Sequence, residues 1–231
     1  LMITALVRSE YPITKLICIK TIGNLIADDT ITMLLEQGVA WAITAATTPE
    51  FAEDDEPLED GLQLAGNMYC VIAKYEEGIQ KIIDESGVLR SLAVLMKSKN
   101  PGTRSNAWEV LKAACQHPCQ NRLMEENFLS TLKSMKVESS LHITQNIAAL
   151  LSFLFRDKNI RRIIATDGIG VMKKIYHIDD EITTVQCMEA LARLCCDRST
   201  VKQVIKTKSL DMLHVLSLRP LKSTRSLCFK S

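Results

Sequence analysis

The chain has 231 residues, of which 47% are hydrophobic and 24% charged, a composition that excludes an intrinsically disordered chain. Aromatic residues make up only 5%, and abundant Leu, Ile, Ala and Met favour packed helices over a sandwich or barrel. The net charge of +1 divides unevenly, because residues 1–115 carry 10 basic and 16 acidic side chains whereas residues 116–231 carry 18 and 11.

Similar short segments recur along the chain at a nearly constant interval. Each lies between a short apolar segment and a longer one, and the steps between them are 49, 41, 40 and 41 residues. A period near 41 is typical of helical solenoids, whose units bury their apolar faces by stacking on neighbours. The chain is therefore predicted to be all-α, a right-handed α-solenoid. The recurring segments are centred on Gly38, Gly87, Phe128, Gly168 and Ser209.

The first part of the chain is predicted to contain a partial repeat over residues 1–27 and a full repeat over 28–74. The long step of 49 comes from an insertion in this repeat, because residues 49–60 hold seven acidic residues and no basic one. Like charges and prolines favour a solvated loop there. The alternative is a docking element for a basic partner.

The clearest repeat covers residues 75–116. A first short helix is predicted from Gly78 to Glu85 and a second from Val88 to Met96, with Gly87 in the turn between them. The third and longest helix begins at Pro101, since proline is tolerated in a first helical turn. Prolines shortly before long helices recur in phase, at Pro12, Pro57, Pro101 and Pro220.

The remaining repeats are predicted over 117–156 and 157–196, with a partial repeat over 197–231. The helices of the repeat 157–196 are expected at 159–164, 169–177 and 183–196. Gly168 is expected in the turn between the first two, where a small residue or a positive φ is needed. Both ends of the chain look like parts of a longer array.

The three-helix unit and its turn glycine resemble armadillo repeats over almost the whole chain. Residues 159–168, which read NIRRIIATDG, and residues 21–27, TIGNLIA, carry the closest local resemblance. The resemblance implies a concave groove, lined by third helices, that binds extended peptides. In some armadillo proteins an Asn ladder holds the peptide backbone, and a Trp one turn earlier packs against the peptide side chains.

Two rows of positions correspond to that ladder in this sequence. The first row holds Asn24, Val71, Lys112, Ser152 and Arg193, so the Asn ladder is largely absent. The second row, one turn earlier, holds Lys20, Asn67, Trp108, Ala148 and Glu189. These departures argue against binding of nuclear localisation signals. For Trp108, packing between repeats is an equally open alternative. For Lys112, Glu189 and Arg193 the alternative is that they lie on a solvated helix face. The predicted groove residues are Asn24, Asn67, Trp108, Lys112, Glu189 and Arg193.

Basic residues gather in the second half of the chain. Stacked repeats could align them into a ridge attractive to phosphate backbones, acidic protein tails such as those of tubulin, or an anionic membrane surface. The alternative is a solvated face that keeps the array soluble. Lys202, Lys206 and Lys208 follow in the next repeat. The predicted patch consists of Arg156, Lys158, Arg161, Arg162, Lys173 and Lys174.

The chain has no motif for catalysis or cofactor binding. Cys115, His117 and Cys119 are too few for a zinc site, and a helix end followed by a proline turn explains them. The adjacent Cys195 and Cys196 favour structural thiols over a redox pair. Eight cysteines set in apolar helical segments predict a reducing compartment, cytoplasmic or nuclear. No enzyme activity, metal or cofactor is expected.

Three functions are compatible with this sequence. The leading hypothesis is a non-catalytic scaffold that binds a protein segment along the groove and assembles or regulates a larger complex. The second is an electrostatic adaptor whose basic half docks on nucleic acid or an acidic polymer. The third is a regulatory armadillo domain of a larger protein. The partner and the oligomeric state are not encoded in any recognisable motif.

Overall fold

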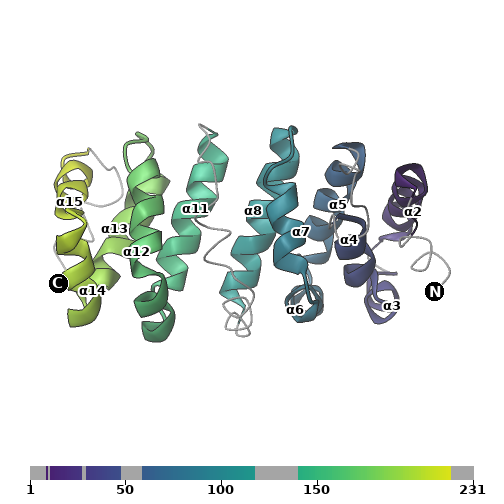
Figure 1. The fold of residues 1–231 in the computed structure, drawn as a ribbon, viewed down its shortest axis with the longest axis horizontal. Helices are drawn as coiled ribbons and strands as arrows, with labels where there is room; N and C mark the ends of the chain where they lie inside the picture. Colours follow the sequence, from purple (N-terminus) through teal and green to yellow (C-terminus); the bar gives the residue numbers. More distant parts are fainter. Residues whose placement is uncertain (1–8, 10, 28–29, 48–58, 118–139, 220–231) are drawn as a thin grey trace. The chain divides into compact units, whose positions relative to one another are not determined.

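A computed structural model of the chain describes residues 9, 11–27, 30–47, 59–117 and 140–219. Every regular element in these residues is a helix, which confirms the all-α prediction. The chain separates into two compact units, residues 1–131 and 132–231 (Figure 1). The repeat boundaries proposed from the sequence, and the single solenoid they imply, stay predictions.

In unit 1, two short helices follow one another between successive long helices along the chain (Figure 1). The long helices lie side by side, and the middle one, α5, packs against both of the others. Two of the long helices start at prolines, as predicted. Pro57 and Pro220 lie outside the described residues. The helices are α2 (Pro12–Leu25), α3 (Ile31–Glu36), α4 (Val39–Thr47), α5 (Glu59–Ile72), α6 (Glu76–Asp84), α7 (Val88–Leu95) and α8 (Pro101–Gln116).

The turns between short helices in unit 1 depend on glycine. Gly38 and Gly87 have φ angles of +80° and +86°, a region that residues with a Cβ rarely occupy. Gly87 directly precedes α7, where the sequence predicted a turn. The corresponding turn near the end of the chain is made by Lys208 with a φ of +53°. At this turn the positive φ falls one residue before the marker Ser209, whose own φ is −88°.

Unit 2 has the same plan with one difference. Its long helices α11 and α13 pack against each other, and α12 packs against α14 (Figure 1). Buried aliphatic side chains from these helices form the core. The helices are α11 (Leu141–Leu154), α12 (Lys158–Ile175), α13 (Glu181–Cys195), α14 (Arg198–Lys206) and α15 (Leu210–Ser217).

The difference is that α12 runs without a break through Gly168, so the predicted turn at this residue is wrong. Gly168 does not have a positive φ. It is buried inside the helix, and a Cβ placed on it would lie 2.5 Å from Cζ of Phe155. The glycine therefore provides room for the buried Phe155 ring rather than a turn, and the first two predicted helices of this repeat are continuous.

Several of the sequence-based predictions concern residues outside the described ones. They are the marker at Phe128, most of the acidic insertion 49–60, the partner cysteine Cys119 and the last predicted helix after residue 220. Among the described helices, none is both long and apolar enough to span a bilayer.

Candidate functional site

The long helices α2 and α5 enclose a cavity of about 320 Å³ on unit 1. Members of both predicted rows line it, Lys20 and Asn24 from α2 and Asn67 and Val71 from α5. In each helix the two residues are four apart, so they lie on the same face one turn from each other. The full lining is Lys20, Gly23, Asn24, Ile26, Leu64, Asn67, Met68 and Val71.

The cavity combines an apolar lining with a polar edge. Met68 is buried, and Leu64 and Val71 are half-buried, so they supply an aliphatic surface. Lys20, Asn24 and Asn67 are exposed. An amide side chain can both donate and accept hydrogen bonds, as a peptide backbone requires, and an ammonium group donates only. The cavity can therefore take an aliphatic side chain while its edge bonds a polar chain.

Asn67 also connects the cavity to the next long helix. Its Oδ1 accepts a hydrogen bond of 2.7 Å from Nδ2 of Asn106 in α8. The backbone oxygen of Asn106 lies 3.4 Å from Sγ of Cys70, which donates to it. The sequence rows missed Asn106 because it lies two residues before the position they indicated. Its separation of 39 residues from Asn67, close to one repeat, is the signal that could have found it.

Trp108 does not line an open groove. It is 3% exposed, and it lies among buried aliphatic residues of α8. An indole at this depth is a packing residue, which corrects its prediction as a partner contact and agrees with the packing alternative. Lys112, one turn further along α8, is half-buried.

Glu189 and Arg193 lie on α13 and bond to α11. Oε2 of Glu189 accepts a hydrogen bond of 2.8 Å from Ser152, and it lies 3.5 Å from Nη2 of Arg193. Nη1 of Arg193 donates to the backbone oxygen of Ser152 and, at 2.8 Å, to its hydroxyl. These groups join two neighbouring long helices. The predicted groove residues of unit 2 are therefore engaged in internal bonds.

Burial lowers the pKa of the Arg193 guanidinium below its usual value, and the Glu189 carboxylate opposes this. Nearby Arg156 and Arg161 lower it further. Arginine remains charged at neutral pH even so. Because Ser152 is near the end of α11, the guanidinium also places a positive charge at the negative end of that helix.

Two residues of the predicted basic patch are also tied to the fold. Arg161 is 11% exposed, donates at 3.0 Å to the backbone oxygen of Phe155, and lies 3.9 Å from the Asp197 carboxylate. Nε of Arg162 donates to the same carboxylate at 3.1 Å. The prediction of Arg161 as a surface cation is wrong, because its side chain lies between Phe155, at the end of α11, and Asp197, just before α14. Arg162 pairs with Asp197, and its side chain is still 46% exposed.

The other predicted patch residues remain at the surface. The Arg156 guanidinium lies 4.9 Å from the centre of the Phe153 ring. Lys173 donates to the backbone oxygen of Thr207. Lys158 and Lys174 are exposed. Arg198, which is not among the predicted patch residues, is exposed at the start of α14, a helix that packs against α12.

Metal binding has no support among the residues that the structure describes. No three of their His, Cys, Asp and Glu side chains come close enough to hold an ion. Burial raises the pKa of the Cys115 thiol, which disfavours the thiolate that zinc needs.

The fold is that of an armadillo-type repeat solenoid. A designed armadillo repeat protein in complex with the peptide (KR)4 superposes with a TM-score of 0.71 at 15% identity, covering 97% of this chain and 94% of that one. Two engineered proteins superpose with TM-scores of 0.67 and 0.68 at 18% and 15% identity, covering 92% and 94% of this chain and 88% of each of theirs.

Comparison by sequence finds no relative. No protein-family model matches the chain. No curated protein matches it either. The armadillo resemblance therefore stands on fold alone.

Proposed function

We propose that this chain is a non-catalytic scaffold that binds an extended segment of a partner protein, with the cavity between α2 and α5 as the contact point. The observation that carries the proposal is the placement of Asn24 and Asn67 together at the edge of one cavity. The amides lie on adjacent long helices, Asn24 in the row that the armadillo resemblance assigns to the Asn ladder and Asn67 in the row one turn earlier. That the designed armadillo protein is in complex with a peptide supports a binding role for this fold.

The chemistry of the cavity suggests what the segment contains. The Met68 and Leu64 side chains favour an aliphatic residue in the cavity, because burying its surface removes apolar area from water. The Lys20 ammonium favours an acidic residue beside it. A partner segment with an acidic residue two positions from an aliphatic one fits both requirements, since residues two apart in an extended chain point to the same side.

The proposal is tested by selecting binders from a random peptide display library on the parent chain. Affinities of the selected peptides are then compared for the parent, for Asn24→Ala/Asn67→Ala, and for Asn159→Ala, which removes an exposed amide in unit 2. Loss of two backbone hydrogen bonds should weaken binding by about 1–3 kcal/mol, roughly 5- to 150-fold.

The control variant should bind with parental affinity. Selection of no peptide, or equal affinity for the parent and the double variant, would contradict the proposed groove. A selected set without acidic residues would remove the assigned role of Lys20 while leaving the two amides in place.

A further inference from the structure

The helices α12 and α14 of unit 2 are held side by side and parallel. Nε of Arg162, near the start of α12, donates at 3.1 Å to Asp197, the residue just before α14. Lys173, near the end of α12, donates to the backbone oxygen of Thr207, the residue just after α14. The start and the end of α14 are thus both bonded to α12, so the two helices form one surface.

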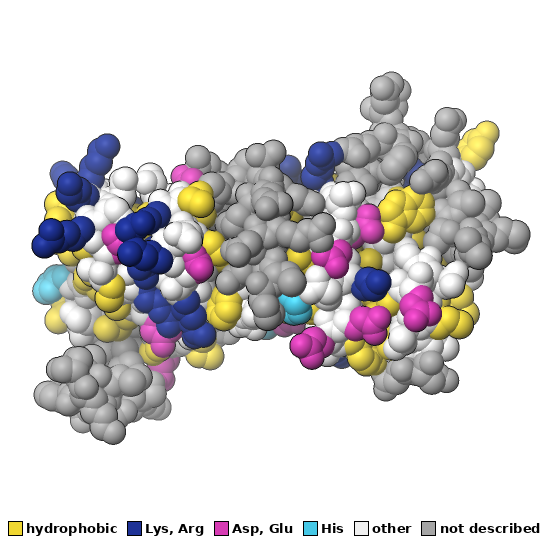
Figure 2. All heavy atoms as spheres, turned by 90° about the horizontal axis from the view of Figure 1, so that it is seen from below, with side chains coloured by type: hydrophobic (Ala, Val, Ile, Leu, Met, Phe, Trp, Pro, Cys, Tyr) yellow, Lys and Arg dark blue, Asp and Glu magenta, His cyan; other side chains and the backbone are white. Residues whose placement is uncertain are grey.

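Exposed cations lie on both of these helices, and on α14 they form a row. Arg198, Lys202 and Lys206 follow one another at intervals of four residues along α14, and all three are exposed. On α12, Lys158 and Arg162 are four residues apart and exposed, and Lys174 is exposed near the other end of the helix, twelve residues further along. Figure 2 shows Lys and Arg gathered over this end of unit 2. We call this set the basic surface: Lys158, Arg162, Lys174, Arg198, Lys202 and Lys206.

Few acidic residues accompany these cations in α12 and α14. Within α12 and α14 the one acidic residue is Asp167, which is half-buried. Asp197 at the start of α14 is itself buried, and it is bonded by Ser199 and Arg162. The three cations on α14 form no ion pair with another residue in the described part of the chain. The surface therefore keeps a concentrated positive potential.

The spacing of the α14 row suits a polypeptide. Four residues of helix rise about 6 Å, and alternate residues of an extended chain are about 6.6–6.8 Å apart. An extended segment with acidic alternate residues could therefore bring successive carboxylates beside successive cations. Ile205 is 57% exposed between Lys202 and Lys206, and it offers an apolar contact that a phosphate backbone would not use. Neither helix carries an aromatic ring on which nucleic-acid bases could stack.

We propose that the basic surface is a docking site for an acidic polypeptide segment, distinct from the cavity between α2 and α5. The chain itself contains a sequence of this kind, residues 49–60, with seven acidic residues and the apolar Phe51 and Leu58. This segment supplies a probe of defined composition. The carboxylates of a docked acidic peptide pair with the cations of the basic surface, and an apolar side chain of the peptide contacts Ile205.

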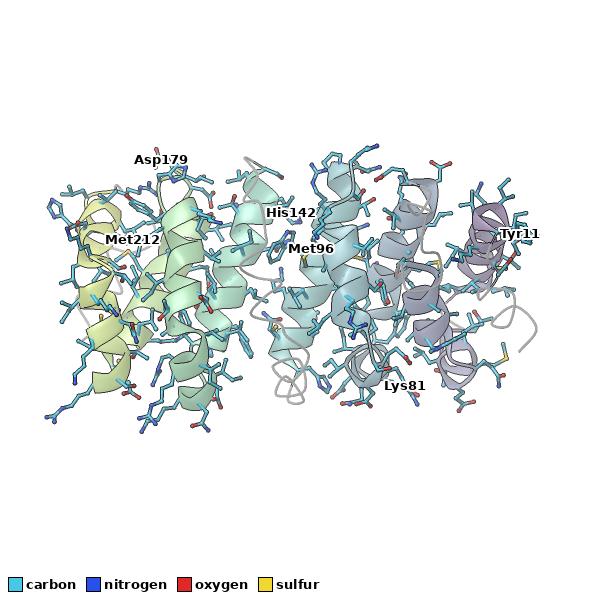
Figure 3. The ribbon with its side chains drawn as sticks, viewed as in Figure 1. Tyr11, Lys81, Met96, His142, Asp179 and Met212 are labelled. Carbon is cyan, nitrogen blue, oxygen red and sulfur yellow. The ribbon has the colours of Figure 1, made fainter. Side chains whose placement is uncertain are left out.

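The test measures binding of a fluorescent peptide with the sequence of residues 49–60 by fluorescence anisotropy at 150 mM NaCl. The full chain is used with Glu53→Gln, Asp54→Asn, Asp55→Asn and Glu56→Gln, so that its own copy of the segment does not compete. Lys202→Glu/Lys206→Glu is then added to reverse the α14 row. Lys81→Glu/Lys97→Glu is the matched control, with the same charge change in unit 1, where Figure 3 labels Lys81 on α6.

We expect saturable binding that the α14 variant weakens by about tenfold or more, whereas the control changes it less than about twofold. A peptide whose acids are replaced by amides should not bind. Equal weakening by both variants would reduce the effect to net charge and overturn the proposal. A second outcome would also overturn the proposal. In it, a duplex oligonucleotide or phosphatidylserine vesicles bind more tightly than the peptide, and the substitutions at Lys202 and Lys206 weaken that binding. Thermal unfolding of each variant shows whether it is folded.

Discussion

Two glycines in α12 have opposite surroundings. A Cβ on Gly168 would lie 2.5 Å from Cζ of Phe155, a ring that is fully buried, whereas a Cβ on Gly170 would meet no atom within 4 Å. Glycine inside a helix is otherwise unfavourable, since it loses more backbone entropy on folding than alanine does. Substitutions at the two positions therefore distinguish the cost of filling occupied space from the gain in helix propensity.

We expect Gly170→Ala to raise the free energy of unfolding by about 0.5–1 kcal/mol. Gly168→Ala should lower it, because overpacking typically costs about 1–3 kcal/mol, more than the gain in propensity. Urea unfolding followed by circular dichroism measures both. Equal stabilisation by the two substitutions would mean that Phe155 does not pack against Gly168.

Buried hydroxyl groups connect three helices of unit 1. The Tyr69 hydroxyl of α5 lies 2.6 Å from Oγ1 of Thr44 in α4 and donates at 3.2 Å to Ser91 in α7. Ser91 is also bonded to Thr47, and Thr44 donates to the backbone oxygen of Ala40. Each hydroxyl thus has a second partner. Burial raises the pKa of Tyr69 to about 12.

Tyr69→Phe should destabilise unit 1 by about 1 kcal/mol at pH 8, because Thr44 and Ser91 keep their other partners. The raised pKa makes this contribution dependent on pH. It is fully present below the unfolded tyrosine pKa of about 10, and it declines as pH rises towards 12, since only the unfolded chain releases the proton. The stability difference between parent and variant, measured by urea unfolding, should shrink from pH 8 to pH 10.5. A constant difference would contradict a buried neutral hydroxyl.

At the scale of the element, α14 depends on one carboxylate. Asp197 accepts hydrogen bonds from the backbone nitrogen and hydroxyl of Ser199 at 2.9 and 2.8 Å, which caps the helix. With the Arg162 guanidinium, these bonds lower its pKa to about 2. The same carboxylate attaches α14 to α12, so it determines both where the helix begins and against what it packs.

Asp197→Asn should remove the ionic part of this attachment and part of the acid sensitivity of unit 2. A lowered folded pKa gives stability that is present above the unfolded value near 3.9 and is lost as pH falls towards 2. The parent should therefore lose more stability than Asp197→Asn between pH 5 and pH 3 in urea unfolding. Asp211→Asn, which changes an exposed acid on α15, serves as the control and should follow the parent. Parallel pH profiles for all three proteins would contradict the assignment.

At the scale of the whole molecule, the cysteine thiols of the two units differ in how deeply they are buried. Cys18, Cys115 and Cys187 are buried in the long helices, whereas Cys195 and Cys196 are exposed at the end of α13. Burial raises the pKa of Cys187 to about 12, although Arg219 lowers it slightly. Because the thiolate is the reactive form, burial and the raised pKa both slow the reaction of Cys187, whereas exposure makes Cys195 and Cys196 accessible.

Brief alkylation with iodoacetamide at pH 8, followed by peptide mass spectrometry, should label Cys195 and Cys196 and leave the buried three unlabelled. Urea should make all five reactive, which provides the control. Rapid labelling of Cys115 or Cys187 in the native protein would contradict the packing of their helices. Labelling of Cys18 alone would indicate opening confined to α2.

Two of the predicted groove residues, Asn24 and Asn67, line one cavity together with Lys20 and Val71 of the same two rows. The rows indicate such neighbours because helical spacing places residues four apart on one face, and the repeat places equivalent faces side by side. That a partner binds at this cavity stays a prediction. Trp108 occupies a row position but is buried, since the rows specify direction and not depth.

By itself, the sequence determined the helical class, the period and the turns at Gly38 and Gly87, because these follow from local spacing and backbone preference. Only the tertiary structure decided which polar side chains form bonds within the fold and which remain exposed. Arg162 meets Asp197 across 35 residues, and Arg193 meets Ser152 across 41. Such pairs form between stacked repeats, so an isolated helix pattern cannot tell a bonded arginine from an exposed one. The continuous α12 was decided in the same way, by the ring of Phe155 against Gly168.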